Sequence, residues 1–187
     1  RFKILDIGWG RGKILGSLSS KLKLKEKPLG IDIVNHKDKD KRINFKRVNV
    51  SKLSLRKDEK FDVILIKQTI HLIKFDEIKR LLKSLRKNLN SNGRIFIFTL
   101  DTEKNEIPTF KLMRQKLNKS LQRDKKILKI IKNLYPHFIK KSFSFNVKIT
   151  KKKYIYMIQN RYISTLISLS KKQIDQGTQE IEQRYKS

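Results

Sequence analysis

Three glycines at alternate positions are the first residues in this sequence that indicate chemistry. In the stretch ILDIGWGRGKIL, an apolar run leads to Asp6, and Gly8, Gly10 and Gly12 follow before apolar residues return. Glycine allows the backbone to adopt positive φ and allows a ligand to approach the main chain closely. The pattern therefore predicts a tight strand-to-helix turn with a ligand against its backbone.

The spacing of these glycines excludes two phosphate-binding motifs. A P-loop needs four residues between its glycines and then Lys followed by Ser or Thr. Here Gly8 and Gly12 enclose only three residues, and Ile14 follows Lys13. The dinucleotide fingerprint Gly-x-Gly-x-x-Gly would place its third glycine where this chain has Lys13. The turn is therefore not predicted to bind a pyrophosphate.

Short β-rich runs alternate with helical segments over the first 100 residues, which predicts β-α-β units and an open parallel sheet. Several runs are almost continuously apolar, as is typical of strands buried on both faces. A helix is predicted over residues 76–89, closed by a turn at NSNG. The predicted strands are residues 2–8, 28–34, 44–50, 61–67 and 93–100. The predicted fold class is α/β, a Rossmann-like open, mostly parallel twisted sheet with helices on both faces.

After residue 100 the pattern becomes mainly helical. Apolar residues recur at helical spacing from Phe110 to Ile131, and Pro136 is expected to end that helix. The alternation in SFSFNVKI predicts a strand over 142–149. A further helix is predicted over 155–169 and a last polar one over 171–185. We expect residues 1–100 to bind the ligand. We expect residues 101–187 to complete the same domain and to cover the acceptor site, where a second substrate would accept a group from the ligand.

Taken with the segments that follow it, the pattern Asp-x-Gly-x-Gly-x-Gly resembles the first motif of the class I S-adenosylmethionine-dependent methyltransferases. Asp32 ends the second predicted strand, twenty residues beyond Gly12. FDVILIKQTIHLI resembles the fourth-strand block of this family, and LRKNLNSNGRIFIFTL resembles the helix, turn and fifth strand of its type 11 and type 25 groups. The resemblance covers residues 3–100. It implies the class I fold, S-adenosyl-L-methionine as the cofactor and S-adenosyl-L-homocysteine as the product.

The resemblance also implies roles for individual residues. Asp32 is placed to accept both ribose hydroxyls. Asn49 stands where the family usually has an aspartate that meets the adenine amino group, and its amide oxygen can accept the same hydrogen bond. Asp6 would order the turn, and Lys67 would lie near the cofactor carboxylate. The predicted cofactor-binding residues are Asp6, Gly8, Trp9, Gly10, Gly12, Asp32, Ile33, Asn49, Val50 and Lys67.

Two residues have alternative interpretations. Trp9 is larger than the usual residue at its place, and its side chain either flanks the cofactor or packs outside the turn. His71 follows the fourth predicted strand, where the acceptor enters in this family. It is the candidate catalytic residue, because an imidazole can take a proton from the acceptor near neutral pH. A structural role for His71 is the alternative.

Composition limits the possible partners. The chain of 187 residues has no cysteine, which excludes disulfides and thiolate metal sites, and no metal-ligand spacing is evident. The formal net charge of +30 comes from 47 Lys and Arg against 17 Asp and Glu, which favours a polyanionic partner, although AT-rich coding also enriches lysine. No apolar run reaches the roughly 18 residues of a membrane span, so we expect a soluble, cytoplasmic protein. The start at Arg1 inside a strand predicts a preceding segment.

These observations favour in-line methyl transfer to an oxygen, nitrogen or carbon atom of a small-molecule acceptor. One alternative is a tRNA or rRNA methyltransferase, which the charge favours. Against it, KQTIH replaces the Asn/Asp-Pro-Pro-Tyr motif of amino-group methylases of nucleic acid, and the absence of cysteine excludes the cytosine-C5 mechanism. The other alternative is a Rossmann-like binding domain without turnover.

Overall fold

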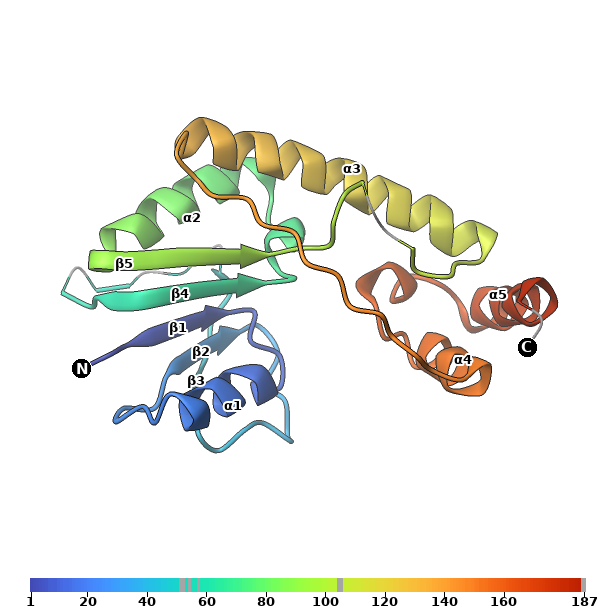
Figure 1. Cartoon of the computed structure of the whole chain (residues 1–187), viewed down its shortest axis with the longest axis horizontal. Helices are drawn as coiled ribbons and strands as arrows, with labels where there is room; N and C mark the ends of the chain where they lie inside the picture. Colours follow the sequence, from blue (N-terminus) through green and yellow to red (C-terminus); the bar gives the residue numbers. More distant parts are fainter. Residues whose placement is uncertain (51–52, 54, 57, 104–105, 186–187) are drawn as a thin grey trace. The chain divides into compact units, whose positions relative to one another are not determined.

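The first of two compact units, Arg1–Thr99, is built around a five-stranded sheet (Figure 1). The computed structural model describes residues 1–50, 53, 55–56, 58–103 and 106–185. All four strand pairings are parallel, in the order β3-β2-β1-β4-β5. The strands are β1 Ile4–Ile7, β2 Leu29–Asp32, β3 Asn44–Arg47, β4 Phe61–Lys67 and β5 Leu89–Phe98.

The strand order reverses direction at the centre of the sheet. Helix α1, Lys13–Lys21, links β1 to β2, and helix α2, Phe75–Lys87, links β4 to β5 on the other side of β1. Since parallel crossovers are right-handed, two crossovers that run in opposite directions place their helices on opposite faces, as Figure 1 shows. Ligands of such sheets bind beyond the strand ends at the reversal, here between β1 and β4.

Burial of apolar strands and helix faces stabilises this unit. All four residues of β1 are buried, and Ile64 and Ile66 of β4 are fully buried beside them. Helix α2 buries the face formed by Ile78, Leu81, Leu82 and Leu85. Full burial of one such side chain contributes about 1.5–3 kcal/mol. The sheet and α2 therefore hold the strand ends in place.

The predicted turn at NSNG is wrong. Helix α2 ends at Lys87, and β5 already begins at Leu89, which pairs with Phe61. The Nδ2 of Asn90 donates to Oδ1 of Asp62 over 2.7 Å, and the register shifts between Phe61 and Val63. Residues 90–93 lie between the pairs Phe61–Leu89 and Val63–Arg94, opposite Asp62 alone, so these polar, turn-forming residues form a bulge in the edge strand.

The second unit, Leu100–Ser187, is helical. It contains α3 Lys111–Leu134, α4 Lys151–Gln159, the 3-10 helix η3 Ser164–Leu166 and α5 Lys171–Arg184. Its core packs around Phe110, against which Gly177 of α5 lies so closely that a Cβ there would be 2.6 Å from the ring. Helix α3 ends before Pro136, and α5 covers the predicted polar helix, so both predictions are confirmed.

Two predictions for this unit are wrong. Residues 142–149 form no strand in the structure, and Phe143, Phe145 and Val147 are 69–80% exposed. Alternation alone does not make a strand, which also needs a neighbouring strand to satisfy its backbone. The helix predicted over 155–169 ends at Gln159 in a Schellman motif, with Arg161 at a φ of 50° and the N–H of Tyr162 donating to the Met157 carbonyl.

The division at Thr99 and Leu100 agrees with the composition change expected near residue 100. That the second unit completes the methyltransferase fold and covers the acceptor site stays a prediction.

Candidate active site

The glycine turn joins β1 to α1 at the central reversal of the sheet. Gly8, Gly10 and Gly12 have φ values of 73°, 61° and 72°, a backbone region that L side chains rarely adopt. The N–H of Gly8 donates to the carbonyl of Ile31 over 2.9 Å, which ties the turn to β2. All three glycines are therefore required by the backbone, as their pattern predicts.

The three glycines have different surroundings. A Cβ at Gly8 would lie 1.7 Å from Oγ1 of Thr69, so this glycine allows the segment after β4 to approach the turn. A Cβ at Gly12 would lie 2.0 Å from the ring of Trp9. At Gly10 a Cβ would meet nothing within 4 Å. Gly10 is thus the glycine whose open side offers space to a ligand.

Trp9 packs beneath the turn. Its side chain is 3% exposed and stacks on Phe45 with ring centroids 5.2 Å apart, and its ring lies against Gly12 and Gly30. Of the two interpretations of Trp9, the structure shows core packing, and the indole is not available to flank a cofactor. The sequence did not reveal this, because the small residues that make room for the ring, Gly12 and Gly30, are distant from each other in the chain.

Asp32 joins the end of β2 to the glycine turn. Its Oδ2 accepts a hydrogen bond from the N–H of Gly10 and its Oδ1 accepts one from the N–H of Val34, both over 3.0 Å. The side chain is only partly buried. A carboxylate has about four acceptor positions, so each oxygen can still accept a further hydrogen bond. The site thus has a fixed, partly exposed hydrogen-bond acceptor, the Asp32 carboxylate, beside the open side of Gly10.

Apolar surface lies next to this carboxylate. Ile33 is 59% exposed and Val34 is 50% exposed, directly after β2. The N–H of Val48 donates to the carbonyl of Asp32 over 2.9 Å, so the segment after β3 also begins here. It continues with exposed Asn49 and partly buried Val50. An aromatic ring could lie on this surface with polar groups at its edge.

Asp6 is a buried carboxylate at the end of β1. It is 3% exposed, and its Oδ1 is buried without a hydrogen-bond partner in the described part of the chain. Burial raises the pKa of Asp6 from 3.8 to about 6. Attraction to Lys67 lowers this pKa, and repulsion from Asp32 raises it. An unsatisfied buried acceptor beside a ligand turn is suited to a cationic or hydrogen-bond-donating group.

The segment after β4 lies beside the turn. Gln68 has a φ of 51° and donates its N–H to the carbonyl of Phe98 over 3.0 Å. The Thr69 hydroxyl donates to the carbonyl of Lys67 over 2.9 Å. His71 follows in the 3-10 helix η2, Ile70–Leu72, and is partly buried. The contact of Thr69 with Gly8 has no signal in the sequence, since it depends on the parallel pairing of β1 and β4.

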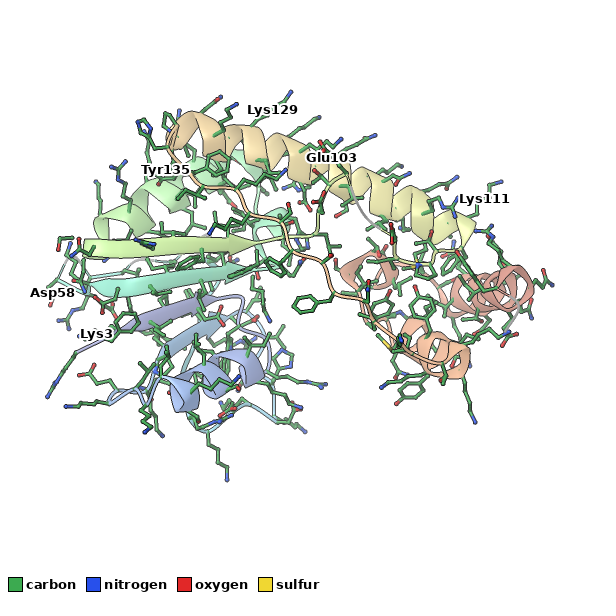
Figure 2. All side chains as sticks on the ribbon, viewed as in Figure 1. Lys3, Asp58, Glu103, Lys111, Lys129 and Tyr135 are labelled. Atoms are coloured by element: carbon green, nitrogen blue, oxygen red, sulfur yellow. The ribbon has the colours of Figure 1, made fainter. Side chains whose placement is uncertain are left out.

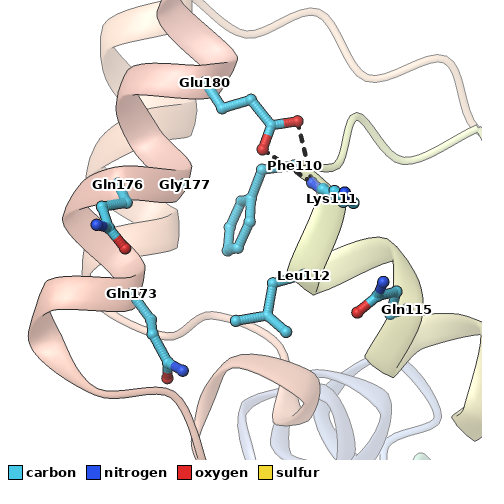
Figure 3. A pocket seen from close by; sticks show the side chains of 8 residues that line it. All are labelled: Phe110, Lys111, Leu112, Gln115, Gln173, Gln176, Gly177 and Glu180. Atoms are coloured by element: carbon cyan, nitrogen blue, oxygen red, sulfur yellow. Dashed lines mark hydrogen bonds between the residues drawn. The ribbon is translucent and has the colours of Figure 1, made fainter.

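A separate pocket of about 290 Å³ lies in the second unit, between the start of α3 and α5 (Figure 3). Both carboxylate oxygens of Glu180 accept the N–H of Lys111 over 3.0 Å, and Arg184 pairs with the same group. Gln173 forms a capping box with Ser170. These polar groups stabilise helix ends, so the pocket offers few free groups for chemistry.

Two kinds of feature are absent from the described residues. They contain no group of three or more His, Asp or Glu side chains that could hold a metal ion. None of their helices combines the length and the apolar character that crossing a membrane requires.

Comparison with known proteins identifies the fold class of the chain. Residues 4–93 match the sequence profile of the family described as a methyltransferase domain. The plantazolicin methyltransferase BpumL, solved with a pentazolic desmethylPZN analog and SAH, has a TM-score of 0.57 and 19% identity, with 100% of this chain and 72% of that chain covered. A SAM-dependent methyltransferase from Aquifex aeolicus has a TM-score of 0.51 and 18% identity, with coverage of 71% and 70%.

A TehB-like SAM-dependent methyltransferase from Corynebacterium glutamicum ATCC 13032 Kitasato is 25% identical at a TM-score of 0.44. It covers 51% of this chain, and the match spans about half of that protein, 53% of its length. No curated protein sequence matches the chain significantly.

The reversed parallel sheet and its glycine turn define a Rossmann-like domain of the class I methyltransferase fold. Residues 4–93, which are 90 of the 187 residues, are similar to the methyltransferase-domain family. BpumL, which shares the fold, is described as solved with SAH, the demethylated product of S-adenosyl-L-methionine.

Proposed function

We propose that this enzyme transfers the methyl group of S-adenosylmethionine to an oxygen, nitrogen or carbon nucleophile of a small-molecule acceptor. The observation that carries the proposal is the open side of Gly10 beside the Asp32 carboxylate, whose charge also acts on the buried carboxylate of Asp6. A nucleoside joined to an amino acid presents hydroxyls to one carboxylate and an ammonium group to the other. The donor set therefore fits this cofactor.

In this proposal each cofactor moiety has its own residues. Asp32 accepts the ribose hydroxyls, while Ile33, Val34 and Val50 contact the adenine ring and Asn49 accepts from its amino group. The backbone of Gly8 and Gly10 lies against the methionine part. Trp9 contributes only through its backbone and by supporting the turn. Asp6 and Lys67 attract the ammonium and carboxylate groups, respectively.

The bound cofactor supplies an electrophilic methyl group on a sulfonium, which is a good leaving group. The residues of the chain need to align the acceptor for in-line attack and to exclude water, because alignment alone contributes strongly to such a reaction. His71, after β4, accepts a proton from an acidic acceptor nucleophile in this proposal. The second unit covers the acceptor.

Two observations support a small acceptor. The segment KQTIH after β4 lacks the motif of nucleic-acid amino methylases. BpumL, which shares the fold along the whole chain, is named as a plantazolicin methyltransferase and was solved in complex with a pentazolic desmethylPZN analog and SAH. We expect the enzyme to act in the cytoplasm.

Calorimetric titration with S-adenosylmethionine and, separately, with NAD tests the cofactor site. We expect micromolar binding of S-adenosylmethionine alone. A Cβ at Gly10 meets no atom within 4 Å, so Gly10→Val places its side chain in the open side, and circular dichroism checks that it still folds at a φ of 61°. Asp32→Ala removes a hydrogen-bond acceptor, so both variants should bind at least about tenfold more weakly. Asp175→Ala, which removes an exposed aspartate of the second unit, is the charge-matched control. Unchanged binding by Gly10→Val would refute the site.

A further inference from the structure

Helix α3 carries nine of the 21 Lys and Arg residues of the second unit. Its sequence, KLMRQKLNKSLQRDKKILKIIKNL, has a single acidic residue, Asp124. Helix α5, KKQIDQGTQEIEQR, contains three basic and three acidic residues. The excess of basic over acidic residues is therefore larger on α3 than on α5.

The buried side of α3 is apolar and includes its only acidic residue. Met113, Leu117, Ile127 and Ile131 are 0–6% exposed, and Asp124 lies on the same side at 5% exposure. The opposite side of the helix therefore carries cations and neutral amides without a carboxylate. Its field is not offset by acidic residues of the helix itself.

Five exposed lysines form what we call the basic face of α3: Lys119, Lys125, Lys126, Lys129 and Lys132. Among the residues that the structure describes, none of the five forms an ion pair or a side-chain hydrogen bond. Figure 2 shows Lys129 pointing away from the helix. Their charges are thus available to an anionic partner.

The basic face has an internal order that follows from the 3.6-residue period of the helix. Exposed Asn118, Gln122 and Asn133 align with Lys129 in a central row. Lys125 and Lys132 lie along one side of this row.

Lys119 and Lys126 lie along the other side of the central row. The central row, with three amides and one lysine, thus lies between two rows of lysines, and these outer rows match a ligand that carries two parallel lines of negative charge.

Three physical arguments select the ligand. Insertion into a membrane would need an exposed apolar side, but the apolar side of α3 is buried, so an anionic membrane would attract the basic face by charge alone. Single-stranded nucleic acid would need aromatic platforms, and α3 has no aromatic residue. The major groove of A-form RNA is closed to side chains, whereas that of B-form DNA, about 12 Å wide, admits a helix of 10–12 Å diameter.

We propose that the basic face of α3 binds duplex DNA. The central row faces the base edges of the major groove, where its Asn and Gln side chains can pair with adenine and its lysine with guanine. The two lysine rows contact the phosphates on either side of the groove. This surface is independent of the methyl-transfer reaction, and its test does not require cofactor binding.

The test is fluorescence anisotropy with a labelled 16-base-pair DNA duplex across a salt series. The α3 variant is Lys119→Gln, Lys125→Gln, Lys126→Gln and Lys132→Gln, the four lysines of the two outer rows. The control is Lys21→Gln, Lys25→Gln, Lys79→Gln and Lys83→Gln, which removes the same charge from four exposed lysines of the first unit. Circular dichroism checks that both variants fold.

The wild-type protein should bind the DNA duplex more tightly than an RNA duplex of the same sequence or phosphatidylserine vesicles. The α3 variant should lose about tenfold or more in affinity, and its salt slope should fall by about 3–4 because each phosphate contact contributes about 0.9. The control should stay within about twofold of the wild type.

Equal loss in both variants, or no loss in the α3 variant, would overturn the proposal. So would tighter binding of the RNA duplex or of the vesicles. The double variant Lys126→Gln and Lys132→Gln should show about half the change in slope, and a slope equal to that of the wild type would also contradict the proposal. Calorimetry with S-adenosylmethionine should give the same affinity for all variants, which separates this test from that of the cofactor site.

Discussion

The substitution Asp6→Asn tests whether a buried carboxylate beneath the glycine turn lowers the stability of the enzyme at neutral pH. Asp6 is 3% exposed, and burial raises its pKa to about 6, from 3.8, in spite of Lys67. Ionisation in the folded protein therefore costs more than ionisation in the unfolded chain. Asparagine keeps the shape of the protonated form and cannot ionise.

The sign and size of the effect follow from linkage. Because the folded pKa lies above the unfolded one, the stability present below about pH 4 is lost as the pH rises through about 6. A difference of roughly 2 pKa units corresponds to about 3 kcal/mol in the free energy of unfolding. Between pH 4 and pH 8, Asp6→Asn should therefore become more stable by about 3 kcal/mol relative to the wild type.

Urea denaturation of both proteins without cofactor, at pH 4, 5, 6, 7 and 8, measures this difference. Other titrating carboxylates affect both proteins equally and cancel, and so does any fixed cost of burying the amide. Parallel stability curves over the whole range would refute the buried, unpartnered carboxylate. The difference should grow between about pH 4 and pH 6 and stay constant above that range, and a solvated Asp6 would give parallel curves because it titrates alike in both states.

Three further substitutions probe the packing. Gly12→Ala combines a φ of 72° with a Cβ 2.0 Å from Trp9, so it should lower the free energy of unfolding by about 2–5 kcal/mol in thermal unfolding. Gly10→Ala should lower it by only about 1–2 kcal/mol, because its Cβ meets no atom. Equal losses in the two variants would contradict their different surroundings. Trp9→Ala should cost about 3–5 kcal/mol, while Trp9→Phe should cost less and leave the S-adenosylmethionine affinity unchanged; weaker binding by Trp9→Phe would show that the indole meets the cofactor. Ser170→Ala removes the capping box of α5 and should cost about 1 kcal/mol, with exposed Ser168→Ala as the control; equal values for the two would show that the cap contributes nothing.

Most of the first unit was predictable from the sequence because its signals are local. A run of apolar residues predicts a buried strand wherever it occurs, and β4 was predicted at its exact bounds, Phe61–Lys67. The three glycines and Asp32 follow from the backbone that a strand-to-helix turn requires, and the structure shows that backbone at Gly8, Gly10 and Gly12. Local geometry thus determined the turn and the strand ends around it.

Elements that depend on distant neighbours were predicted less well. Residues 142–149 alternate like a strand, but a strand needs a partner, and alternation does not supply one. Strand β5 begins at Leu89, which pairs with Phe61, and NSNG forms a bulge within the strand instead of a turn before it. In both cases the bounds of the strand depend on which residues find a partner in another strand.

The same distinction applies to the site. The sequence by itself determined the sheet class, the glycine turn and the position of Asp32, because each depends on the residue types within one short segment. Only the tertiary structure decided that Trp9 lies in the core, that Thr69 approaches Gly8 and that an oxygen of Asp6 is buried without a partner. These three facts depend on which strands become neighbours, and burial and contact exist only after the chain has brought distant segments together.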